Sequence, residues 1–234
     1  MSGLLYKNFF LYRIELIVIG VLQIICSFTV ILNSAQTGGS EETMLLNMIV
    51  HFNMFFLTSL FDSGLFANDE KRVATCFAIS TPKGAKSQIQ SKYYTLLIVN
   101  LAVLFFCFVT DVICCVIMDS VLYSCASFMI IFFSFSIILT AFGVPFIIRF
   151  GSNNGGNVKI STVGVLILLI GIYILFGDIS FFMADDPVAE LMKLLTAENV
   201  MLVLSFIPYA AIILYYISYR ISLALYRKGA ENYD

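Results

Sequence analysis

The sequence predicts an all-α integral membrane protein with six transmembrane helices and both termini in the cytoplasm. Composition is the first observation behind this prediction. Apolar residues make up 60% of the 234 residues, charged residues make up 12%, and the mean hydropathy is +0.97. Such values indicate that lipid is the solvent for most of the chain. The other two observations are six apolar runs and a one-sided distribution of basic residues.

The six runs are uncharged and have about the length that a helix needs to cross the hydrocarbon core. They lack the alternating pattern of a membrane β-strand, so a helix is the structure that satisfies their backbone in lipid. The predicted helices cover 16–32, 43–61, 93–110, 121–148, 160–177 and 200–219. The third and fifth continue past Asp111 and Asp178 to about 118 and 184. A secretory signal peptide is the alternative for the first run, which is longer than a typical signal core.

The basic residues predict the orientation, because Lys and Arg are retained on the cytoplasmic side during insertion. Lys193 is the one basic residue of thirteen on the predicted outer side. The other twelve precede helix one, follow helix six, or lie in the connections between helices two and three and between four and five. Six crossings return the chain to its starting side, so the helix count and the charge bias agree. With a net charge of −2 and dispersed basic residues, no nucleic-acid partner is expected.

The inward connection 66–92 is predicted to carry a short cytoplasmic helix. Asn68 can cap this helix, and the two acidic residues that follow suit its first turn. Val73, Cys76 and Phe77 stand at i, i+3 and i+4 and form a narrow apolar stripe, which a partner is expected to cover. A solvated loop whose lysines only obey the topology rule is the alternative.

Thr81 before Pro82 predicts a second helix start. From it, a basic stretch is expected to run through Lys83, Lys86 and Lys92 into the third membrane helix.

The outward connection 183–199 is predicted to form a short amphipathic helix at the outer interface. Asp185 and Asp186 before Pro187 are typical of a helix start. The apolar positions that follow at helical spacing are Val188, Leu191, Met192 and Leu195. We expect a structural lid or plug here, and a cargo-release gate is the alternative.

Polar groups within the membrane are candidates for a substrate path, since they are costly there. The candidates are His51, Asn100, Asp111 and Asp178. For Asp178, and for Asp62 near the inner end of helix two, the favoured interpretation is interfacial placement. Asp111 is equally consistent with a water-facing role and with pairing inside the bundle, whereas His51 and Asn100 are expected to form helix-helix hydrogen bonds. No metal site is predicted, because His51 is the only histidine and the cysteines lack paired spacing.

Three features of the chain resemble the permease subunits of ABC-2 type transporters. Residues 1–10 (MSGLLYKNFF) are similar to the elbow before helix one of that family, and residues 66–94 (FANDEKRVATCFAISTPKGAKSQIQSKYY) are similar to its acidic run, Pro turn and Lys-Tyr entry into helix three. The six-helix layout is the third feature. The resemblance is greatest to the small six-helix permeases that include the phenol-soluble modulin exporter.

The resemblance implies a type V exporter-like ABC-2 permease fold that forms one transmembrane domain over 1–234, with an interfacial elbow over 1–13. The segment 66–92 would couple the permease to a groove on a separate ATPase. The coupling residues would be Asp69, Glu70, Lys71, Arg72, Val73, Phe77, Ile79, Ser80, Thr81 and Pro82. The partners would be a second copy of the chain, two ATPase subunits that bind ATP and magnesium, and an exported cargo of amphipathic, antimicrobial-type or otherwise hydrophobic peptide.

No catalytic residue or cofactor is predicted for the chain itself. The stretch Gly84–Ser87 lacks the glycine spacing and the preceding strand of a phosphate-binding loop, so ATP hydrolysis is expected in the partner. An ion-coupled secondary transporter that uses Asp111 or Asp178 is the alternative function. An intramembrane protease is disfavoured, because the chain has neither two histidines nor a Gly-x-Ser-x-Gly motif.

Overall fold

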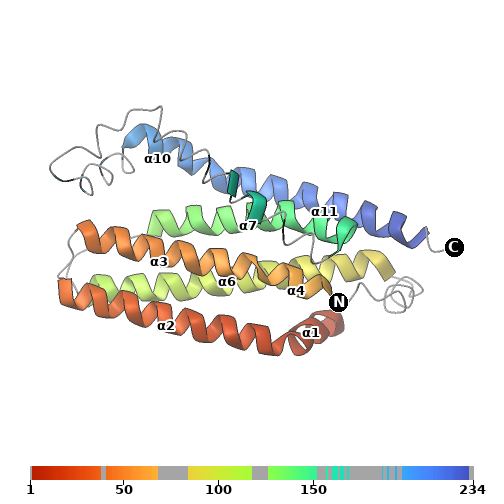
Figure 1. Cartoon of the computed structure of the whole chain (residues 1–234), viewed down its shortest axis with the longest axis horizontal. Coiled ribbons are helices and arrows are strands. Elements are labelled where there is room, and N and C mark those ends of the chain that lie inside the picture. Colours follow the sequence, from red (N-terminus) through yellow and green to blue (C-terminus); the bar gives the residue numbers. More distant parts are fainter. Residues whose placement is uncertain are drawn as a thin grey trace.

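The computed structural model describes residues 2–37, 41–67, 84–117, 126–151 and 197–231, together with positions 157, 160–162, 164, 165, 168, 186, 189 and 193. Within these ranges the secondary structure is α-helical, as the predicted fold class requires. The helices are α1 (Ser2–Leu11), α2 (Arg13–Thr37), α3 (Glu41–Ser59), α4 (Phe61–Ala67), α6 (Gly84–Ile117), α7 (Ala126–Phe150), α10 (Glu198–Ser205) and α11 (Ile207–Glu231). The long helices lie alongside one another in an elongated bundle (Figure 1).

Five helical stretches of the described chain are long and apolar enough to cross a membrane. They are Arg13–Gln36, Thr43–Phe66, Gly84–Ile117, Ala126–Phe150 and Glu198–Lys228. Each overlaps one of the predicted spans. The remaining predicted span, 160–184, falls mostly outside the described residues, and its described positions 160–162, 164, 165 and 168 are helical. A total of six spans therefore stays a prediction.

Two of the five stretches are broken helices. Between α3 and α4, the Leu60 N–H donates to the Leu57 carbonyl at 3.2 Å, the i to i−3 bond of a tightened turn. Between α10 and α11, the Phe206 N–H bonds the Val203 carbonyl at 3.2 Å, and Pro208 two residues later has no N–H to continue the α-helical ladder. Hydropathy alone predicts one continuous run across each break.

Helix α6 begins well before its apolar run, close to the helix start that Thr81 and Pro82 predict. It starts at Gly84, although the apolar run begins at Tyr93, and its 34 residues extend for about 50 Å at 1.5 Å per residue. This exceeds the hydrocarbon thickness of about 30 Å, so the helix projects beyond the membrane core. Residues 84–92 of the predicted coupling segment 66–92 are thus a helical extension of the transmembrane span.

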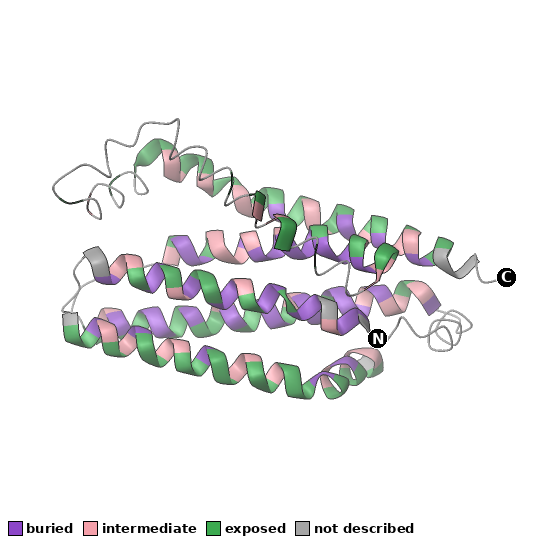
Figure 2. Ribbon diagram, viewed as in Figure 1, coloured by how far each residue is buried: buried purple, intermediate pink, exposed green. Residues whose placement is uncertain are grey.

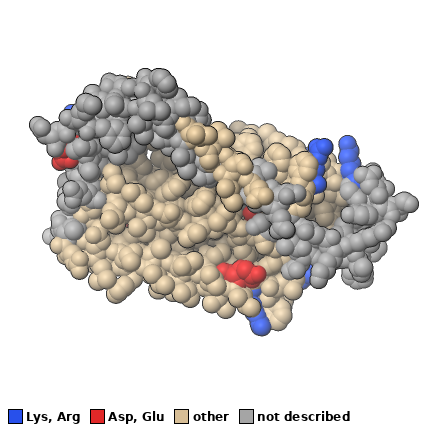
Figure 3. Space-filling model, in the orientation of Figure 1, with Lys and Arg blue, Asp and Glu red and all other residues tan. Residues whose placement is uncertain are grey.

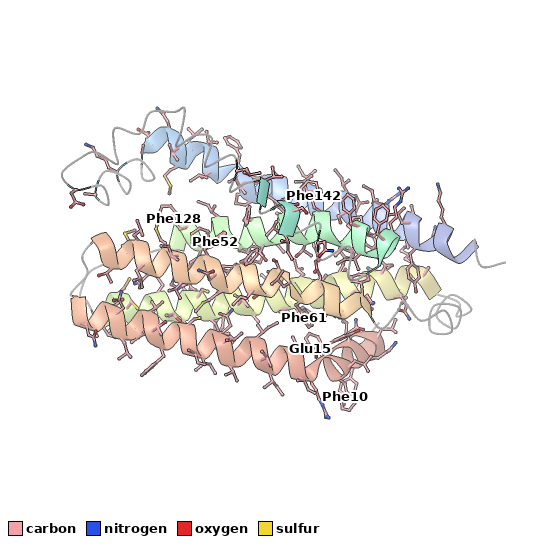
Figure 4. All side chains as sticks on the ribbon, viewed as in Figure 1. Phe10, Glu15, Phe52, Phe61, Phe128 and Phe142 are labelled. Carbon is pink, nitrogen blue, oxygen red and sulfur yellow. The ribbon has the colours of Figure 1, made fainter. Side chains whose placement is uncertain are left out.

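The bundle has two apolar cores that follow one another along its long axis. The termini-end core consists of Tyr12, Phe61, Leu65, Phe66, Ile89, Tyr93, Leu96, Val99, Val144, Ile147 and Tyr226. The far-end core consists of Met48, Met54, Phe55, Val103, Cys107, Phe128 and Met129. Buried residues line the inner faces of the helices (Figure 2), and the labelled Phe61 and Phe128 mark the two cores (Figure 4). Helices α2 and α11 expose much of their apolar surface.

The N-terminal helix and the C-terminal end of α11 lie at the same end of the bundle (Figure 1). In the space-filling view, Lys and Arg side chains gather mainly at this end (Figure 3). Both observations agree with an even number of crossings, and the cytoplasmic location of this end stays a prediction.

Helix α1 forms a separate segment at the position of the predicted elbow, 1–13. It ends at Leu11, and α2 starts at Arg13. The Asn8 Nδ2 lies 3.4 Å from the Ser91 Oγ and 3.3 Å from the Thr95 Oγ1, so α1 packs on the first turns of α6.

Candidate functional site

Three of the buried polar residues of α6 mark successive junctions with other helices. Lys92, Asn100 and Asp111 are all buried, and their spacings of 8 and 11 residues keep them within one buried stripe. At 1.5 Å per residue, the spacings correspond to about 12 and 16 Å along the axis. The polar groups therefore form three levels through the bundle.

The first level lies in the termini-end core and joins α6 to α4. Lys92 is 3% exposed, and its Nζ donates to the backbone carbonyl of Leu65 at 2.7 Å. The same nitrogen lies 4.1 Å from the centroid of the Phe66 ring, a cation–π geometry. The Tyr12 hydroxyl donates to the same Leu65 carbonyl at 3.1 Å. One backbone oxygen thus connects α4 to the α1–α2 junction and to α6.

Asp62 belongs to the same region of the bundle. It is 0% exposed, and on α4 it lies three and four residues before Leu65 and Phe66, so all three share one helix face. Asp62 therefore lies inside the bundle, and its predicted depth near the membrane interface stays a prediction. Lys92 likewise lies inside the bundle and not in a solvated loop, because α6 has already made more than two turns before it reaches this position.

Tyr93 connects α6 to α11. Its hydroxyl lies 2.7 Å from the Ser218 Oγ and 2.8 Å from the Ser222 Oγ, and its backbone carbonyl accepts a hydrogen bond from the Tyr215 hydroxyl at 2.7 Å. The Tyr93 ring meets the rings of Tyr215 and Tyr219 edge-on at 5.1 and 5.6 Å. Sequence reasoning missed this contact. The signal in the sequence is the i, i+4 spacing of both the serine pair and the tyrosine pair on α11.

The second level joins α3, α6 and α7 near the middle of the bundle. The Ser136 hydroxyl lies 2.7 Å from the Asn100 Oδ1 and 3.2 Å from the Phe55 carbonyl. The Asn100 Nδ2 donates to the Leu96 carbonyl of its own helix at 2.9 Å. Asn100 therefore makes the interhelical hydrogen bond that the sequence analysis expects, and it does so between the two apolar cores.

The third level lies among α2, α3 and α6 toward the far end. His51 is 1% exposed, and its Nδ1 lies 2.6 Å from the Asn47 carbonyl, so this hydrogen bond stays within α3 and is not the expected interhelical one. The Asn47 Nδ2 donates to the Ser34 Oγ of α2 at 3.0 Å. Asp111 is 5% exposed and close enough to act electrostatically on His51. Two of the candidate path residues are thus brought together.

The predicted coupling residues and Asp178 lie outside the described residues. The chain leaves α4 at Ala67 and enters α6 at Gly84, next to the first polar level. On the predicted outer side, the Ala189 N–H donates to the Asp186 Oδ1 at 3.2 Å, which is the capping bond that the Asp-Asp-Pro pattern predicts. The amphipathic stripe of the segment 183–199 is outside the described residues.

The described residues include no group of three His, Cys, Asp or Glu side chains that could hold a metal ion. Cys107 takes part in packing, with its Sγ 3.5 Å from the Met54 Sδ in the far-end core. The arrangement contains buried hydrogen bonds between helices, and these can transmit movement from one helix to another.

Several long apolar helices with buried polar junctions define a multi-pass membrane protein. The sequence model of one family, described as an ABC-2 family transporter protein, matches residues 3–227, and the chain therefore belongs to this family. Members are the membrane component of transporters and associate with an ABC ATPase subunit. No curated protein and no solved structure matches the chain.

Proposed function

We propose that the chain is the permease subunit of an ATP-driven exporter of amphipathic or hydrophobic peptides in a bacterial plasma membrane. The family match over residues 3–227 carries the transporter part of this proposal. Export and a peptide cargo rest on the resemblance described above. ATP and magnesium would bind to the partner ATPase and not to this chain.

The Leu65 carbonyl supports a route by which the ATPase could move the membrane helices. The proposed coupling segment leaves the bundle from α4 and returns into α6, and Lys92 ties these two helices together through Leu65. A force on the segment would therefore move α4 and α6 as one unit. Tyr93 would transmit that movement to α11 through Ser218 and Ser222.

Two copies would be needed to enclose a path. The described helices α2 and α11 expose apolar residues over much of their length, including Ile17 and Ile24 on α2 and Ile212 and Tyr216 on α11. These surfaces can face lipid or a second copy. We place the cargo path between two copies, with one ATPase bound to each.

The test is to co-express the chain with an ABC ATPase subunit from the same genome and to purify the complex through a tag on the permease. We expect the ATPase to co-purify, and we expect Ile79→Ala and Pro82→Ala to reduce ATP-dependent transport about tenfold, equivalent to 1.4 kcal/mol of coupling. Lys193→Ala, on the predicted outer side, is the control and should keep transport. Loss of the ATPase from the wild-type preparation, or full transport by both variants, would refute the coupling assignment.

An ion-coupled secondary transporter is the second candidate, because buried Asp111 lies near His51. A protonophore distinguishes the two functions in inverted vesicles supplied with ATP. The ABC function predicts transport that persists without a proton gradient. The alternative predicts transport that stops when the gradient collapses.

A further inference from the structure

A groove of about 480 Å³ lies between α7 and α11, on the outside of the bundle. Its walls are mainly aromatic and aliphatic, with Phe142 and Phe146 from α7 and Ile217, Ile221 and Leu225 from α11. Figure 4 shows Phe142 on the α7 side next to α11. The volume is within the range of about 300–1,000 Å³ that is common for small-ligand sites.

The groove is open to the surroundings of the bundle. Phe142, Phe146, Ile217 and Ile221 retain between 40% and 48% of their exposure in the complete chain. Among the residues that the structure describes, no side chain therefore fills the groove. A ligand that enters it would cover apolar side chains from two helices at once.

The floor of the groove offers no free hydrogen-bonding group at Ser218. The Ser218 hydroxyl donates to the Ala141 carbonyl at 2.6 Å, and it also meets the Tyr93 hydroxyl at 2.7 Å. Both the donor and an acceptor position of this hydroxyl are occupied. The body of the groove thus suits a hydrocarbon chain better than a polar ligand.

One end of the groove is cationic. Arg149 is the charged residue of the lining and stands in the last turn of α7, with its guanidinium 5.4 Å from the Phe150 ring centroid. On α11, Lys228 continues the stripe of Leu214, Ile217, Ile221 and Leu225 by one further turn. Helical side chains lean toward the N-terminus, so the long Lys228 side chain can reach back toward the groove, whose lining on α11 ends at Leu225.

The length of α7 would bring these two cations to the level of lipid headgroups. Helix α7 has 25 residues and spans about 37 Å, so its last turn lies beyond a hydrocarbon core of about 30 Å. Helix α7 contains no acid, and the one acid of α11 is Glu231 at its last position, so a second copy that packed here through the same face would bring the cations of both copies together. A negatively charged ligand with an apolar tail would both fill the apolar groove and pair with the two cations.

We propose that this groove binds one anionic phospholipid, with an acyl chain between α7 and α11 and the phosphate at Arg149 and Lys228. Basic sites between transmembrane helices are known to take anionic headgroups. The bound lipid would hold α7 against α11 next to Ser218, and thereby next to the Tyr93 junction. This inference does not depend on the proposed export function.

Native mass spectrometry of the full-length protein in detergent tests the proposal, with dioleoyl phosphatidylglycerol and dioleoyl phosphatidylcholine as probes. We expect one phosphatidylglycerol to be retained about tenfold more strongly than phosphatidylcholine. The double variant Arg149→Gln and Lys228→Gln should remove this preference, and Arg149→Lys should keep most of it. Arg220→Gln is the matched control, because Arg220 is exposed on α11 and donates to the Tyr216 hydroxyl at 3.3 Å, away from the groove stripe.

A second variant tests the apolar part of the site with both cations intact. Ile217→Trp should fill the groove and reduce retention of phosphatidylglycerol, while the melting temperature without added lipid stays near that of the wild type. Equal retention of the two lipids by the wild type, or an equal loss in Arg220→Gln, would overturn the proposal. Photo-crosslinking from position 217 that yields a second copy of the chain in place of lipid would also overturn it.

Discussion

The Lys92 ammonium donates a hydrogen bond to the Leu65 backbone carbonyl at 2.7 Å, across the interface between α6 and α4. Leu65 lies near the end of α4 and Lys92 lies in α6, so the two residues stand on either side of the connection between these helices. Because the Tyr12 hydroxyl donates to the same oxygen, the junction also holds the start of α2. This one carbonyl therefore links three parts of the bundle at the end where both termini lie.

Lys92→Met should destabilise the protein, because methionine keeps most of the side-chain volume but loses the charged donor. We expect a loss of about 2 kcal/mol, as for a buried hydrogen bond from a charged group. Thermal denaturation in detergent measures the change as a lower melting temperature. Lys86→Met is the control, since Lys86 is exposed in the first turns of α6. Equal melting temperatures for the two variants would contradict a structural role for Lys92.

Tyr93→Phe should weaken the contact between α6 and α11. The phenylalanine ring keeps the edge-on contacts to Tyr215 and Tyr219 but loses the hydroxyl that meets Ser218 and Ser222. A loss of about 1 kcal/mol is expected, within the range for hydrogen bonds between membrane helices. The neighbouring Tyr94→Phe is a matched control, because Tyr94 is 43% exposed. If both variants have the melting temperature of the wild type, the expectation is wrong.

Asn100 and Ser136 should be energetically coupled. A double-mutant cycle with Asn100→Leu and Ser136→Ala is expected to give a coupling energy of about 0.6–1.7 kcal/mol, as for hydrogen bonds inside other helix bundles. The equivalent cycle with Asn53→Leu is the control, since the Asn53 Nδ2 is exposed and donates to the Ile49 carbonyl of its own helix. Additive effects in the Asn100 cycle would show that the contact between α6 and α7 carries no net energy.

Asp111→Asn should retain ATP-driven transport if Asp111 pairs inside the bundle. Asparagine has nearly the same shape and can still accept a hydrogen bond, but it carries no charge. The measurement is peptide export by inverted vesicles with ATP, compared with the wild type at matched protein levels. A complete loss of transport at unchanged stability would instead favour the titrating role of an ion-coupled carrier.

Hydropathy located the helices well but not their ends. Leu60 and Pro208 interrupt spans that are continuous in apolar character, because a tightened turn and a missing N–H leave no trace in average hydropathy. Hydropathy also misses the start of α6 at Gly84, for the opposite reason, whereas the Thr81-Pro82 pattern predicts a helix start close to it. Residues 84–92 are polar enough to resemble a loop, yet packing against α1 through Asn8 and Ser91 stabilises them as helix.

The partner of a buried polar residue could be predicted where the chemistry of its side chain alone requires one. The position of a polar residue could not be predicted where the packing of the helices decides it. The candidate Asn100 has the expected interhelical partner in Ser136, since an amide in lipid must find one. Asp62 lies near the end of an apolar run, and that position alone favours an interface. Its burial follows from the direction in which α4 turns after Leu60, which no local pattern contains. The serines that contact Tyr93 are more than 120 residues away in sequence.

By itself, the amino-acid sequence determined that this is a multi-pass helical membrane protein, because apolar length and charge bias act locally on each segment as it enters lipid. Its resemblance to ABC-2 permeases was also visible before any folding was considered. Only the tertiary structure decided that Lys92 and Asp62 are buried, that Asp111 lies near His51, and that α7 and α11 leave a groove with a cationic end. These features depend on the rotation and depth of each helix relative to its neighbours, which packing between distant residues sets.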